Sequence, residues 1–164
     1  MSTAVPATDE VGKDLANAFA WSMAHTVAPE ELPFFQDIAT DFWKDPQAAI
    51  AKGGRGESIG FGIDEAMTTT LLLAVATPVL NSLASALGNA IKERVTPKVT
   101  GWVRRIFGVG PRTADPIPRL SSEQLGIVRS STLHQALRSG MPGPQAEILA
   151  DAVVGATVTA IRQG

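Results

Sequence analysis

The chain has 164 residues, no cysteine and a formal net charge of −2 at pH 7. A chain of this length is typical of one domain. A compact fold of this size buries about two thirds of its unfolded surface, so a hydrophobic core can form without disulfide bonds. The lack of cysteine excludes disulfides and thiolate metal sites, and the slight acidity argues against nucleic acid as a partner.

The small net charge conceals an uneven distribution along the chain. Residues 1–65 carry eleven acidic and four basic side chains, residues 92–119 carry two acidic and seven basic ones, and residues 120–164 carry three of each. Opposite charge on the two sides of an apolar helix is typical of a membrane protein whose basic side faces the cytoplasm. A soluble helical bundle with a dipolar surface is the alternative.

Residues 1–52 form an acidic segment that is predicted to be helical. Its first helix is expected from about Asp9 to Val27, with Thr8 as the N-cap. His25, near the helix end, is interpreted as a cap or a solvated side chain. A row of small side chains on this helix would let a second helix approach closely. The row consists of Ala16, Ala20, Ala24 and Ala28.

A second helix is predicted to open at Pro29, because proline suits the first helical position. Phe35, Ile38 and Phe42 share one face of it, and the Lys-Asp-Pro sequence at 44–46 ends it. A short helical turn over 46–52 and a glycine-rich hinge over 53–62 follow. The hinge lacks the spacing of a phosphate-binding loop, so no nucleotide site is expected.

The segment from Ala66 to Ile91 contains 26 residues and no charge, and it forms the centre of a helix predicted over about residues 64–95. A helix needs roughly 20 apolar residues to cross a bilayer, so this one is long enough to do so. Two interpretations are open: the helix lies in lipid, or it forms the buried core of a soluble bundle.

On a helical wheel this segment is amphipathic although it is uncharged. Asparagine amides left unpaired in lipid cost about 1 to 3 kcal/mol each, so a solitary span would be marginal. In a membrane the polar stripe would pair between copies, whereas in a soluble bundle it would lie near the surface. The predicted lipid contacts are Leu72, Val79, Leu83 and Leu87, and the predicted contacts between copies are Asn81, Ser85 and Asn89.

A basic amphipathic helix is predicted after Pro97, and together with the long helix it makes up residues 63–107. A tryptophan at headgroup level, and about 1 kcal/mol for each basic residue near an anionic surface, favour contact with the cytoplasmic leaflet. An ordinary bundle helix with a solvated basic edge is the alternative. The residues predicted to contact the membrane are Trp102, Arg104, Arg105 and Ile106.

Residues 108–120 are rich in proline and glycine and are predicted to be a linker. Residues 121–164 are predicted to form a helical hairpin, capped at Ser121 or Ser122, with Gly140 closing the first helix and Pro144 opening the second. Apolar faces are expected to hold the two helices together. They comprise Leu125, Val128 and Leu137 on the first helix, and Ile148, Leu149, Ala152, Val153 and Ala156 on the second.

The sequence thus predicts an all-α fold of about six to seven helices around one long uncharged helix. Because no nucleophile elbow, metal-ligand spacing or carboxylate pair is recognisable, the protein is predicted to be non-enzymatic and to need no cofactor or metal. The abundance of alanine and the preference for arginine over lysine indicate a bacterial, GC-rich genome.

The preferred hypothesis is a membrane-associated interaction protein at the cytoplasmic face of the inner membrane, either a bilayer-perturbing effector or a membrane-anchoring subunit. Its partner would be an anionic membrane surface or another protein, and self-assembly into a homo-oligomer is a further option. The alternative is a soluble cytoplasmic adaptor or scaffold in which the helix at 66–95 is the buried core.

Overall fold

The computed structural model describes residues 4–49, 68–92, 97–108 and 116–163. Within these ranges the chain is helical and has no strand, which confirms the predicted all-α class. The elements are α1 (Ala4–Val27), the 3-10 helix η1 (Pro29–Phe34), α2 (Phe35–Lys44), α4 (Thr68–Ala90), α5 (Pro97–Ile106), α6 (Ser122–Arg138) and α7 (Gly143–Gln163). Residues 46–49 are also helical, and the predicted hinge at 53–62 lies outside the described residues.

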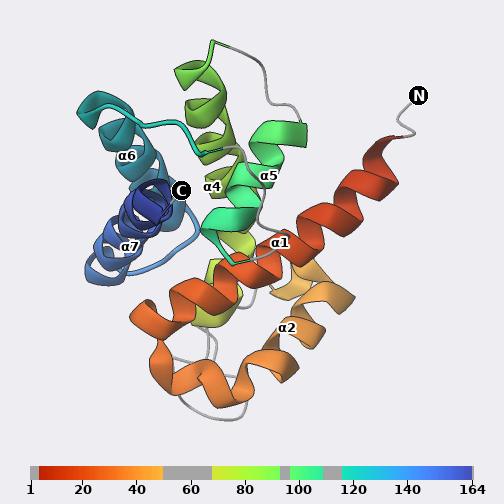
Figure 1. Ribbon diagram of the computed structural model, residues 1–164. Helices are drawn as coiled ribbons and strands as arrows, with labels where there is room; N and C mark the ends of the chain where they lie inside the picture. Colours follow the sequence, from red (N-terminus) through yellow and green to blue (C-terminus); the bar gives the residue numbers. More distant parts are fainter. Residues whose placement is uncertain (1–3, 50–67, 93–96, 109–115, 164) are drawn as a thin grey trace.

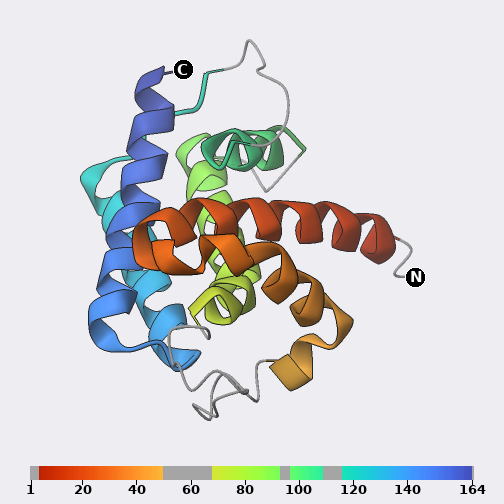
Figure 2. The same ribbon diagram turned by 90° about the horizontal axis from the view of Figure 1, so that it is seen from below.

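The other helices pack around α4, as predicted for the long uncharged helix (Figures 1 and 2). α1, α2, α5 and α6 all contact α4, and α7 packs on α6 and α1. The apolar side of α4 is enclosed by these helices, and four of its large side chains have no exposed area. They are Leu72, Val79, Leu83 and Leu87. The core of the protein therefore lies along α4.

α1 contacts α4 and α7, and its row of alanines, which was predicted to let a second helix approach, is covered. All four alanines are buried, and small side chains let helix backbones come close. The helix begins at Ala4 rather than at Asp9, so the prediction of Thr8 as its N-cap is wrong. Pro6 does not prevent this earlier start, since a proline in the first helical turn removes only a backbone N–H that has no partner within the helix.

The segment after α1 begins at Pro29, as expected, but its first six residues form the 3-10 helix η1. Pro33 lies inside η1, and a proline has no N–H to donate to the preceding turn. The α-helical geometry starts only at Phe35. Phe35 and Phe42 are buried, Ile38 is half-buried, and the helix ends before Asp45, as predicted.

The C-terminal hairpin forms as predicted, with α6 and α7 packed side by side. Ser121 is the N-cap of α6 and makes a reciprocal capping box with Gln124. At the other end, Gly140 adopts a φ of 101°. There the Met141 N–H donates to the carbonyl of Ala136 and the Gly140 N–H to that of Leu137, both at 3.1 Å. This is a Schellman motif, which closes the helix and starts the turn into α7.

The faces that join α6 and α7 to the protein differ from the predicted ones. Leu137 and Ile148 were expected in the interface, but 48% and 45% of their surfaces are exposed. Thr132 and Thr157 are fully buried instead. Each threonine hydroxyl donates to the carbonyl four residues earlier at 2.8 Å. Because its hydroxyl is hydrogen-bonded within the helix, each threonine can be buried like an apolar residue. The buried face of each helix is therefore the one that contains the threonine.

Candidate functional site

The residues predicted to contact lipid on α4 lie inside the protein, and the polar stripe opposite them lies on its surface. Thr68–Ala90 is long and apolar enough to span a bilayer, but a core helix of a soluble protein passes the same test, and most of this helix is buried. The exposed stripe includes Asn81, Ser85 and Asn89, spaced four residues apart. This arrangement is the one expected of a soluble bundle; membrane association itself stays a prediction.

The amphipathic face of α5 is also turned inward. Trp102 and Ile106 are buried together with Val99 and Val103, against α4 and α7. Arg104 and Arg105 are half-buried, and Arg104 Nη2 donates to Asp14 Oδ2 of α1 at 3.0 Å. In this structure the predicted headgroup contacts of α5 therefore hold the helix to the rest of the protein.

The indole N–H of Trp102 is buried and has no hydrogen-bond partner among the described residues, whereas that of Trp43 donates to Asn17 Oδ1 at 2.7 Å. We expect Trp102→Phe to change the free energy of unfolding by less than about 1.5 kcal/mol, because the lost packing is offset by removal of an unsatisfied donor. Urea unfolding followed by circular dichroism measures this. Trp43→Phe is the matched control, and per unit of buried area removed it should cost more, because it also breaks the hydrogen bond to Asn17. A loss of stability above about 1.5 kcal/mol in Trp102→Phe would contradict the prediction.

A buried carboxylate connects η1 to α4. Glu31 is only 3% exposed, and its Oε1 accepts hydrogen bonds from the Thr69 backbone N–H at 2.8 Å and the Thr69 hydroxyl at 2.5 Å. Burial raises the pKa of Glu31, and the hydrogen bonds from Thr69 oppose that rise without cancelling it. The carboxylate thus caps the first described turn of α4, where the N–H groups of a helix lack partners of their own.

An aromatic surface lies where α1 meets η1 and α2. Trp21 and Phe34 are 43% and 60% exposed. The Trp21 ring meets the Phe35 ring edge-to-face at 5.2 Å and the His25 ring at 4.9 Å, while His25 Nδ1 bonds to the Trp21 carbonyl at 2.8 Å. His25 is exposed, as its interpretation as a solvated side chain predicted. These contacts hold Trp21 in one orientation with nearly half of its surface in water.

An open groove of about 290 Å³ adjoins Trp21. Its walls come from α1 and α2, and Asn17 on one wall is fixed by the bond from Trp43. Asp14 at the rim is engaged by Arg104. Small-molecule sites bury most of their ligand, whereas this groove is open to solvent, so it fits one or two side chains of a larger partner better than a substrate. We call it the α1–α2 groove; it is lined by Asp14, Asn17, Ala18, Trp21, Phe35 and Gln36.

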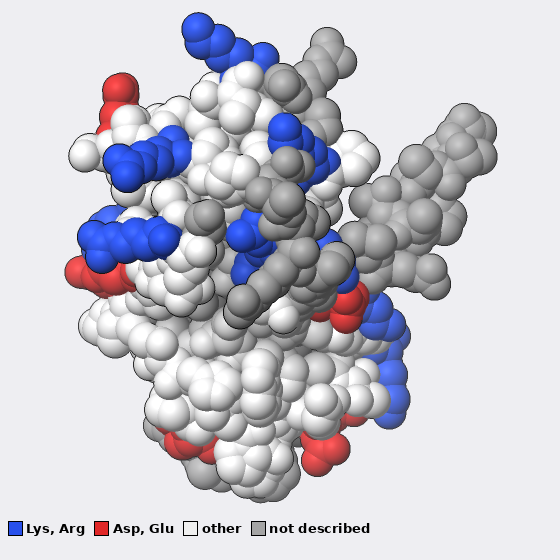
Figure 3. Space-filling view, in the orientation of Figure 1, with Lys and Arg blue, Asp and Glu red and all other residues white. Residues whose placement is uncertain are grey.

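The surface near the α1–α2 groove carries fewer basic side chains than the upper part of the same face. In Figure 3, blue Lys and Arg side chains lie over the upper part of the face and along its right side, and the lower front is largely white, with red Asp and Glu side chains at its edges. Glu30 and Asp37, next to the aromatic residues in sequence, are exposed acids. A partner that covers this surface is therefore expected to be apolar at its centre and neutral or basic at its edge.

The described residues hold no group of three or more His, Asp or Glu side chains that could bind a metal ion. A scan against protein-family models, a search of curated proteins and a search of solved structures each found no match to this chain.

Proposed function

We propose that this protein is a soluble, non-enzymatic helical adaptor that binds an apolar segment of a partner protein in the α1–α2 groove. The observation that carries this proposal is a contrast in burial. The apolar side of the long helix α4 is covered by the chain's own helices, while Trp21, which lines an open groove, and Phe34 remain exposed. Exposed tryptophan held in a fixed orientation is typical of binding hot spots.

Membrane association is the competing hypothesis, and one experiment separates the two. The protein is expressed without detergent, and its lysate is ultracentrifuged with and without vesicles containing anionic lipid. We expect the protein in the supernatant in both cases, because the apolar faces of α4 and α5 are buried in this fold. Sedimentation with the vesicles, or solubility only in detergent, would contradict the proposal and favour the earlier hypothesis.

The groove is tested by photo-crosslinking in cells that make the protein naturally. A photoreactive residue at Gln36, in the groove, should give a discrete crosslinked band, and one at the exposed Thr159 of α7 should not. Trp21→Ala should abolish the Gln36 band, because loss of a central aromatic anchor typically costs about 2 kcal/mol or more of binding free energy. Thr40→Ala, at an exposed position on α2, is the matched control. A Gln36 band that persists in Trp21→Ala would rule out the groove as the binding site.

A further inference from the structure

The outward face of α6 carries a pattern that the adaptor proposal does not use. This face lies roughly opposite the buried row of Val128, Thr132 and Ala136 on the helical wheel. Ile127 and Leu137 on it are 57% and 48% exposed. Exposure of two large aliphatic side chains to water is unfavourable in free energy, and a partner that covers this helix face would remove that exposure.

The exposed residues of this face follow the spacing of a coiled-coil seam. They succeed one another at intervals of four, three, four and three residues, which is the repeat that keeps a straight row against a second helix. Ser130 in the middle is small enough for close approach. We call this row the α6 seam; it consists of Glu123, Ile127, Ser130, His134 and Leu137.

The two ends of α6 have opposite charge. Glu123 lies in its first turn and Arg138 in its last, and both are exposed. A parallel partner helix of the same sequence would place Glu123 against Glu123, whereas an antiparallel one places Glu123 against Arg138 at both ends. The midpoint of this pair falls at residues 130–131, and the midpoint of Ile127 and Leu137 falls at residue 132. The two midpoints are about 2 Å apart along the helix axis, so a single twofold axis near them can bring both pairs of residues together.

We propose that two copies of this chain associate through the α6 seam, antiparallel, about a twofold axis that crosses α6 near residues 130–132. Ile127 of each copy packs on Leu137 of the other, and Glu123 of each copy pairs with Arg138 of the other. The interaction is self-complementary, so it closes at two copies.

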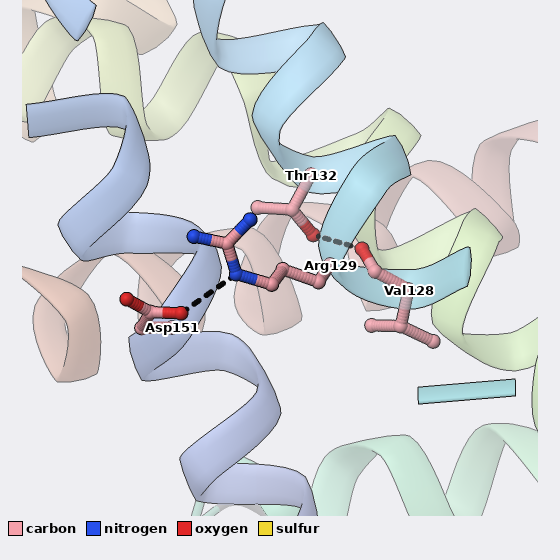
Figure 4. A network of polar contacts seen from close by, with 4 residues as sticks. All are labelled: Val128, Arg129, Thr132 and Asp151. Carbon is pink, nitrogen blue, oxygen red and sulfur yellow. Dashed lines mark hydrogen bonds and ion pairs between the residues drawn. The ribbon is translucent and has the colours of Figure 1, made fainter. Parts of the chain in front are cut away.

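Hydrogen bonds to α7, within α6 and at both ends of α6 fix the position of this helix. Arg129 Nε donates to Asp151 Oδ1 of α7 at 2.7 Å, and Thr132 Oγ1 donates to the Val128 carbonyl (Figure 4). Arg129 is thereby turned toward α7 and is not part of the seam. The capping box and the Schellman motif hold the two ends of the helix where Glu123 and Arg138 lie.

The test measures mass by sedimentation velocity over a range of protein concentrations. The parent should shift from the 17.2 kDa monomer to twice that mass as concentration rises. Glu123→Arg and Arg138→Glu each replace two attractive pairs by two repulsive ones, and each should raise the dissociation constant about tenfold or more. Leu137→Asp should prevent association altogether. Lys44→Glu on α2 makes the same change of charge as Arg138→Glu away from the seam and should have no effect.

A mixture of the two charge variants gives the sharpest outcome. One then carries only basic residues at positions 123 and 138 and the other only acidic ones, so the mixture should form a heterodimer more tightly than either variant forms a homodimer. A parent that stays monomeric up to about 1 mM, variants that behave like Lys44→Glu, or a mixture no tighter than its components would each overturn the proposal. Trp21→Ala should leave the mass unchanged, so failure here and failure of the groove can be told apart.

Discussion

Replacing Leu83 by aspartate is expected to unfold the protein. Leu83 lies in the middle of α4 with no exposed surface, and the helices that pack on α4 come from both halves of the chain. The substitution removes a buried aliphatic side chain, leaves a cavity and places a carboxyl group where no partner can reach it. Together these changes cost more than about 5 kcal/mol, which is the whole stability of many single domains.

The matched control for Leu83→Asp is Ser85→Asp, because Ser85 lies two residues away on the exposed stripe of the same helix. This variant should keep the cooperative thermal transition of the parent, measured by circular dichroism in plain buffer. Leu83→Ala should fall between them, with a loss of about 2 to 5 kcal/mol. If Leu83→Asp melts like the parent, α4 is not the core and the soluble interpretation of this helix is wrong.

The second large effect is expected at Glu31, whose carboxylate caps α4 from a position 38 residues earlier in the chain. Glu31→Lys would bury an ammonium group beside helix N–H groups that need an acceptor, and we expect a loss of about 3 to 5 kcal/mol. Glu31→Ala leaves the Thr69 N–H and hydroxyl without their acceptor and should cost about 1 to 3 kcal/mol. Chemical unfolding at fixed pH measures both losses.

The pH dependence of stability distinguishes the charge of Glu31 from its role as an acceptor. Its pKa is raised in the folded protein, so the folded state binds the proton more tightly than the unfolded chain does. The contribution of this group to stability is therefore greatest below the ordinary pKa of glutamate and is lost as pH rises through the folded-state pKa. Paired surface carboxylates show the opposite trend.

Glu31→Gln is the variant that isolates this effect. Its amide oxygen can still accept from Thr69, but it no longer ionises, so the contribution of this position to the pH profile should vanish. Near neutral pH we expect Glu31→Gln to be at least as stable as the parent, because the desolvation of a buried charge is removed. A strong loss of stability in Glu31→Gln at neutral pH would show that the charged form is the favoured one and contradict the raised pKa.

Local patterns in the sequence were sufficient for most of the helices. The break at Asp45, the start of α5 at Pro97, the Ser121 cap and the Gly140 turn all depend on contacts within a few residues, which a sequence displays directly. The amphipathic pattern of the uncharged segment also predicted correctly which side of α4 would be apolar. It left open whether lipid or protein would cover that side, because both environments accept the same residues.

The candidate sites were harder to anticipate, since they combine residues that are distant in sequence. Nothing near Glu31 indicates that it caps α4, and nothing near Trp21 indicates that α2 would border it with Phe35 and Gln36. The exposure of Leu137 was also missed. The buried face of α6 includes Thr132 instead, whose hydroxyl donates to the Val128 carbonyl. The signal that could have been used is this capacity of a buried threonine to bond back to its own helix.

By itself, the amino-acid sequence determined the all-α class, several of the helix ends and the two sides of the uncharged helix, because turn chemistry and helical periodicity act over a few residues. Only the tertiary structure decided what encloses α4, which carboxylate caps it and which aromatic and aliphatic side chains are left in water. Those outcomes depend on how whole helices pack against each other, and many sequence-compatible arrangements differ only in which faces meet.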